Sequence, residues 1–205
     1  MLSMKVVFLD WFKTLSNSLF WDKISDKEKH DAIVTSCFNM NNHLINPWMR
    51  GKYTSEAIAK IVSKDTGINE KYIYDELIKS ASNMEFSSPE IPKLIKKIKN
   101  NGLLVIIATD NMDTLTRWTV PSLKLNSLFD GVLSSWELNA LKGDFTGKKS
   151  LFFDKFFQDN PSIKPQDCIL TDDSEDKLES IKKYGIAYRK INSKEELIGE
   201  LRGIA

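Results

Sequence analysis

The residues Val6-Val7-Phe8-Leu9 form a continuous apolar run that ends on an acidic residue, Asp10. Four consecutive strand-favouring residues are typical of a central strand in a parallel sheet, which is buried on both faces. In open α/β sheets, ligands bind at the carboxyl ends of the strands. The run therefore predicts an α/β fold, and it makes the Asp10 carboxylate the first candidate for a functional group.

Four further segments have the pattern of short buried strands, namely residues 103–108, 131–135, 167–170 and 186–188. Helical patterns alternate with them from residue 87 onward, which favours a parallel sheet with right-handed crossovers. Parallel strands place their carboxyl ends at one edge of the sheet. Three strands are followed by polar residues that should meet there: Asp10, Thr109 with Asn111, and Asp172 with Asp173.

No strand is expected between residues 16 and 86. Three helices are predicted there: one that opens at the capping box Ser25–Glu28 and ends at Pro47, one capped by Thr54, and one capped by Asn69. We therefore expect a helical cap, residues 16–86, inserted into an α/β core made of residues 1–15 and 87–205. Such a cap would close over Asp10 and exclude water.

The overall charge of the chain limits its partners. The 205 residues include 29 Lys plus Arg and 28 Asp plus Glu, a net charge of +1, which gives no argument for nucleic acid or an anionic membrane. No apolar run approaches the roughly 20 residues of a membrane span. We interpret Cys37 and Cys168 as reduced thiols of a cytoplasmic protein without a signal peptide. A small anionic molecule remains a possible partner, and the sequence does not indicate an oligomeric state.

The residues at the predicted sheet edge suit nucleophilic chemistry. A carboxylate at a strand end can form an aspartyl intermediate on phosphorus or carbon, and clustered carboxylates suit Mg²⁺. The Thr109 hydroxyl at a helix start suits phosphate oxygens, and Lys148 or Lys149 would supply compensating charge. Each feature also has a structural interpretation: Thr109 as a helix cap, the lysines as solvated side chains, and Asp172 with Asp173 as a turn.

Taken in order, these motifs resemble those of the haloacid dehalogenase (HAD) superfamily, in members with a helical cap after the first motif. The matching residues are Asp10 with Thr14-Leu15, then 107–111, then Lys148 or Lys149, then 172–176, with Gly185 beyond them. The resemblance implies a Rossmann-like three-layer sandwich with a parallel five-stranded sheet.

The resemblance also implies roles for single residues. Asp10 would be the nucleophile, with Thr109 and Lys148 as the other catalytic residues. Thr14, Asn111 and Lys149 would bind substrate. Asp10, the backbone carbonyl of Phe12, and Asp172 or Asp173 would bind Mg²⁺. The partner would be a small phosphorylated or other anionic molecule.

Position 12 departs from the phosphatases of this superfamily. They carry a second Asp there, which protonates the leaving group and activates water, whereas this chain has Phe12. Loss of general acid–base help costs roughly 10²–10⁴-fold in rate. Three functions follow as alternatives: a slow Mg²⁺-dependent phosphohydrolase, a carbon–halogen hydrolase, and a non-catalytic module that binds a phospholigand or a protein.

Overall fold

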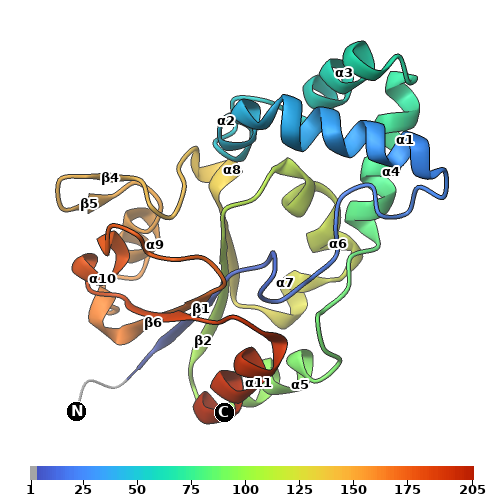
Figure 1. Ribbon diagram of the computed structural model, residues 1–205. Coiled ribbons are helices and arrows are strands. Elements are labelled where there is room, and N and C mark those ends of the chain that lie inside the picture. Colours follow the sequence, from blue (N-terminus) through green and yellow to red (C-terminus); the bar gives the residue numbers. More distant parts are fainter. Residues whose placement is uncertain (1–3) are drawn as a thin grey trace.

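A computed structural model describes residues 4–205. Its centre is a sheet of five parallel strands in the order β3-β2-β1-β6-β7 (Figure 1). The strands are β1 (Val6–Leu9), β2 (Leu104–Thr109), β3 (Gly131–Ser134), β6 (Cys168–Asp172) and β7 (Ala187–Lys190). The first apolar run is therefore the middle strand, and the predicted parallel α/β fold is confirmed.

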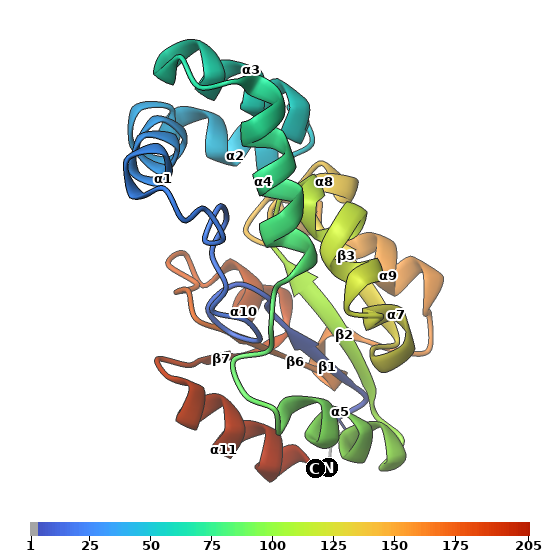
Figure 2. The ribbon, with the colours of Figure 1, turned by 90° about the vertical axis from the view of Figure 1, so that its right-hand side faces the viewer.

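Both faces of β1 are buried because successive side chains point to opposite sides of the sheet. Val7 and Leu9 pack in the core formed with α5 (Ile91–Asn100) and α11 (Lys194–Ile204). Val6 and Phe8 pack on the other side, in the core that includes residues of α9 (Asp154–Asp159) and α10 (Ser180–Tyr184). The result is the expected three-layer sandwich (Figure 2).

Between β1 and α5 the regular elements are all helices. They are α1 (Lys27–Val34), the π-helix η1 (Thr35–Met40), the 3₁₀ turn η2 (Asn42–Leu44), α2 (Ile45–Met49), α3 (Ser55–Thr66) and α4 (Glu70–Ser82). We keep the word cap for residues 16–86. The cap has its own apolar core, which includes Trp21, Trp48 and Leu77. Its helices lie beyond the carboxyl ends of the strands (Figures 1 and 2).

Local sequence signals account for most of the helix ends in the cap. The side chains of Asp26, Thr54 and Asn69 each accept a backbone hydrogen bond at the start of α1, α3 and α4. Gly67 ends α3 with a φ of +70°, which only glycine adopts at low cost.

The prediction that the first helix of the cap ends at Pro47 is wrong, because Pro47 is the third residue of α2. The N–H groups of the first helical turn have no partner within the helix, so proline is tolerated there.

The remaining elements connect β2 to β6. They are the π-helix η3 (Leu115–Thr119), α6 (Val120–Ser122), α7 (Leu125–Leu128), α8 (Ser135–Leu138), the hairpin of β4 (Phe145–Thr146) and β5 (Lys149–Ser150), and the 3₁₀ turn η4 (Pro165–Asp167). No helix among the described residues is long and apolar enough to cross a membrane.

A buried carboxylate joins the cap to the core. Asp113, which is fully buried, accepts hydrogen bonds from Trp48 Nε1 at 2.8 Å and from Ser55 Oγ and N at 2.7 and 3.0 Å. On the core side, Arg117 pairs with Asp113 at 2.7 Å. Because a buried charge without partners is costly, this network favours one position of the cap over the strand ends.

Candidate active site

Two buried carboxylates at the strand ends share one lysine. Asp10 follows β1, and its backbone N–H donates to the Thr171 carbonyl at 3.0 Å. The Nζ of Lys142 lies 2.6 Å from Asp10 Oδ1 and 2.5 Å from Asp172 Oδ2. Asp10, Lys142 and Asp172 are all at most 6% exposed. One cation therefore holds together two acidic residues that would otherwise repel each other.

The turn of residues 141–144 places Lys142. The N–H of Lys142 donates to Asp110 Oδ1 at 2.8 Å, and the N–H of Leu141 donates to Asp144 Oδ2 at 2.9 Å. Asp144 in turn binds Arg50 of the cap, at 2.7 Å for each of two hydrogen bonds. The N–H groups of Leu141 and of Lys142 itself are thus both held by carboxylates, and one of these, Asp144, is tied to the cap.

The charges in this cluster perturb one another. Burial raises the pKa of Asp10 to about 7, against the attraction of Lys142, and the charge of Asp172 raises it further. Burial also disfavours the Asp172 carboxylate, but Lys142 and the N–H of Ser174 hold its pKa below the usual value. Burial opposes the charge on Lys142, yet the surrounding carboxylates keep its pKa well above the usual value. The carboxylates around Lys142 therefore favour its charged form.

A third carboxylate completes a set of oxygen donors. Single oxygens of Asp10, Asp172 and Asp173 lie within 4.8 Å of one another. Burial raises the pKa of the half-buried Asp173, and the neighbouring charge of Asp172 raises it further. An all-carboxylate set with excess negative charge fits a hard divalent cation such as Mg²⁺.

The two threonines predicted for the site are both buried. Thr109, at the end of β2, lies beside Asp10, and Thr14 lies in the loop after β1. Neither hydroxyl oxygen has a hydrogen-bond partner among the described residues, although both are at most 1% exposed. Buried hydroxyls normally have a partner, and the Thr109 hydroxyl is close enough to Asp10 to lower the pKa of that carboxyl.

The structure gives the other predicted site residues, Asn111, Lys148 and Lys149, different surroundings. Asn111 is buried, but its Oδ1 accepts from the N–H of Met112 at 2.9 Å and so serves its own loop. Lys148 and Lys149 are exposed in the β4–β5 hairpin, while Lys142 occupies the position beside Asp10. The sequence reasoning missed Lys142 and Asp110. The available signal was the turn-rich Lys142-Gly143-Asp144 that follows the third strand.

Structural comparison identifies the fold. A HAD family enzyme of Bacteroides thetaiotaomicron, in complex with magnesium and inorganic phosphate, aligns with a TM-score of 0.66 and 14% identity over 94% of this chain and 96% of its own. A protein described as a predicted HAD-like family hydrolase of Porphyromonas gingivalis aligns with a TM-score of 0.68 and 14% identity over 98% and 97%. The L-2-haloacid dehalogenase of Xanthobacter autotrophicus, with chloropropionic acid covalently bound, aligns with a TM-score of 0.65 and 14% identity over 98% and 84%.

The alignments cover the cap as well as the sheet, so the whole chain has the fold of HAD-like hydrolases. No protein-family model matches the sequence, and no curated protein matches it significantly.

Proposed function

We propose that this protein is a HAD-like hydrolase that cleaves phosphate esters in a Mg²⁺-dependent reaction, with Asp10 as the nucleophile. The observation that carries the proposal is the cluster of Asp10, Lys142 and Asp172 at the carboxyl ends of the strands. The buried hydroxyl of Thr109 lies beside Asp10 and suits a phosphoryl oxygen. The solved structures of similar fold include one that holds magnesium and phosphate.

The chemistry has two displacements at phosphorus. A carboxylate oxygen of Asp10 attacks the phosphorus and the ester P–O bond breaks as an aspartyl-phosphate forms. The leaving oxygen takes its proton from water, because Phe12 has none to give. Water then attacks that phosphorus and loses a proton to solvent. The bond between phosphorus and the Asp10 oxygen breaks, which restores the Asp10 carboxylate and releases inorganic phosphate. Lys142 compensates negative charge next to Asp10, and the hydroxyl of Thr109 donates to a phosphoryl oxygen.

Asp10, Asp172 or Asp173, and the backbone carbonyl of Phe12 would hold the Mg²⁺. When bound, the ion supplies positive charge that neutralises the phosphoryl oxygens and favours attack by an anionic carboxylate. The residues present fit it, because the three carboxylate oxygens already converge and Lys142 alone does not balance three acidic groups.

A carbon–halogen hydrolase is the second candidate, since its first step also uses a carboxylate nucleophile. Phe12 favours it, because displacement of a halide needs no proton donor at that position. The dehalogenase of similar fold carries a covalently bound chloropropionic acid. A non-catalytic module that binds a phospholigand or a protein is the third alternative, and it also follows from Phe12.

A panel of phosphate esters, assayed with Mg²⁺ and with chelator, tests the proposal, and 2-chloropropionate assayed for chloride release tests the second candidate. We expect Mg²⁺-dependent phosphate release that Asp10→Asn abolishes. Asp159→Asn, on the exposed end of α9, is the matched control and should retain the activity. Chloride release without phosphate release would replace the proposal by the second candidate, and inactivity toward both would favour the third.

A further inference from the structure

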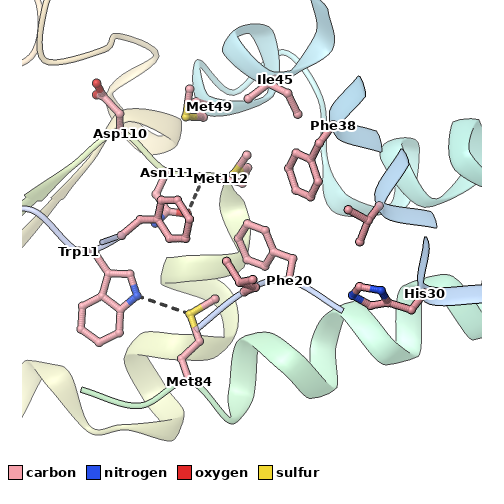
Figure 3. A pocket seen from close by; sticks show the side chains of 13 residues that line it. Trp11, Phe20, His30, Phe38, Ile45, Met49, Met84, Asp110, Asn111 and Met112 are labelled. Carbon is pink, nitrogen blue, oxygen red and sulfur yellow. Dashed lines mark hydrogen bonds between the residues drawn. The ribbon is translucent and has the colours of Figure 1, made fainter. Parts of the chain in front are cut away.

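An apolar cavity of about 380 Å³ lies between the cap and the core. Its core side is formed by Trp11, Phe12 and Met112, and its cap side includes Phe20 and Phe38. The rings of Phe20 and Phe38 are stacked, with their centroids 6.4 Å apart and an interplanar angle of 11°. Figure 3 shows these two rings facing the core residues across the cavity. A cavity of this size and lining is typical of a binding site for a small molecule.

The polar groups around the cavity offer little to a polar ligand. The Oδ1 of Asn111 is engaged by the N–H of Met112. His30 lies at the far side, and its Nδ1 is 2.9 Å from Asp31 Oδ1 (Figure 3). Asp110 points away from the two phenylalanine rings and binds the backbone of Lys142. A ligand in this cavity therefore meets mainly carbon and sulfur.

The cavity adjoins the candidate active site. Phe12 is two residues from Asp10 in the chain, and its side chain is 37% exposed. Asp110 lines both this cavity and a second one of about 290 Å³, which is also lined by Lys142 and Asp172. A molecule with its phosphoryl group at Asp10 would thus have room for its other half beside Phe12.

Exposed apolar side chains in the cavity point to the same kind of ligand. Leu19 is 55% exposed, and with Phe12 it leaves apolar surface in contact with water. Covering such surface with an apolar group is favourable, at about 25 cal/mol per Å². An acid at position 12 would place a charge in this wall. Phe12 cannot transfer a proton, but its ring extends the apolar surface of the cavity.

We propose that the substrate is a small phosphate monoester whose alcohol portion is apolar, an alkyl or aryl group, and that Phe12 is a specificity residue that contacts it. The proposal rests on the proposed function only for the position of the phosphoryl group. Recognition of the apolar group requires no turnover, so binding tests it separately from catalysis.

The test is titration calorimetry with methyl-, butyl- and hexylphosphonate in the presence of Mg²⁺. Their C–P bonds cannot be cleaved by attack of Asp10, so the titration measures binding alone. Kd should fall about three- to fourfold for each methylene that the cavity buries. Equal affinity across the series overturns the proposal but leaves the hydrolase function standing. The absence of binding even by hexylphosphonate also overturns the proposal.

Two matched variants locate the apolar site. Leu19→Asp places a charge in the cavity and should remove most of the gain between methyl- and hexylphosphonate. Leu151→Asp is the control, because Leu151 is 53% exposed but lies outside the cavity lining, beside the hairpin. An equal loss in both variants, or in neither, overturns the assignment. If the protein hydrolyses none of the test esters and still binds the longer phosphonates more tightly, that result refutes the proposed catalysis but not the apolar specificity.

Discussion

The guanidinium of Arg50 in the cap binds both carboxylate oxygens of Asp144 in the core, with its Nε and Nη2 each 2.7 Å from an oxygen. Asp144 also accepts from the N–H of Leu141, next to Lys142. A planar two-bond contact fixes orientation as well as distance. The cap is thereby connected to the turn that supplies the only cation found beside Asp10 in the described part of the chain.

Arg50→Gln should loosen that turn more than it destabilises the protein. The pair is about one-quarter to one-third exposed, so its loss should cost less than about 1 kcal/mol of unfolding free energy. Amide hydrogen exchange at Leu141 should quicken, because its acceptor Asp144 becomes mobile. Arg202→Gln breaks a similar pair with Glu90 far from the site and should leave that amide unchanged. Unchanged exchange in Arg50→Gln would show that the cap does not position the turn.

Lys142→Met should strongly destabilise the protein at neutral pH without Mg²⁺. The substitution leaves Asp10 and Asp172 buried without their counter-ion, and breaking a buried pair costs about 3–5 kcal/mol. The loss should be smaller at pH 5, where Asp10 takes up a proton in place of the ion pair. Lys149→Met, on the exposed hairpin, should change the urea-unfolding free energy by less than about 0.5 kcal/mol. Equal effects of the two substitutions would contradict the assignment of the site lysine.

The raised pKa of Asp10 predicts a pH dependence of stability. Burial lifts that pKa to about 7, so between pH 4 and pH 7 the folded chain binds this proton more than the unfolded chain does. Stability contributed by the protonated group is therefore lost as pH rises through about 7. Urea unfolding at pH 5, 6.5 and 8 without Mg²⁺ should show this decline, and Asp10→Asn should flatten it. A slope that is the same in Asp10→Asn would assign the titration to another group.

Phe12→Asp should raise kcat for a small aryl phosphate by roughly 10²-fold. The new carboxyl can protonate the leaving oxygen and then deprotonate the attacking water. KM for esters with a larger apolar portion should rise as well, because a charge replaces part of the cavity wall. Phe12→Asn separates the two effects, since it removes the ring without adding an acid. A folded Phe12→Asp, checked by circular dichroism, with an unchanged rate would mean that proton transfer is not the limiting defect.

The strand ends were predictable because each is marked locally. A buried apolar run followed by a polar residue identifies Asp10, Thr109 and Asp172, and parallel pairing then places them at one edge. The start of α3 at Thr54 was equally local, since the cap residue and the apolar stripe lie within one turn of each other.

Lys142 could not be chosen in the same way, because its partners are 132 and 30 residues distant along the chain. In sequence it is one lysine in a turn, whereas Lys148 and Lys149 lie shortly before an apolar segment that begins at Leu151. Its place depends on Asp110 and on the Arg50–Asp144 pair, which are tertiary contacts. The cavity beside Phe12 is likewise lined by residues of both the cap and the core, so no single segment predicts it.

The central claim is that Asp10 is a nucleophile, and trapping its covalent intermediate tests this most directly. An aryl phosphate with a good leaving group needs no proton donor for the first step, whereas breakdown by water lacks a base at Phe12. The aspartyl-phosphate should therefore accumulate. Mass spectrometry of protein quenched with acid, after mixing with p-nitrophenyl phosphate and Mg²⁺, should find one added phosphoryl group on the peptide that contains Asp10 and none in Asp10→Asn. Phosphate release without label on Asp10, or label that persists in Asp10→Asn, would contradict the account.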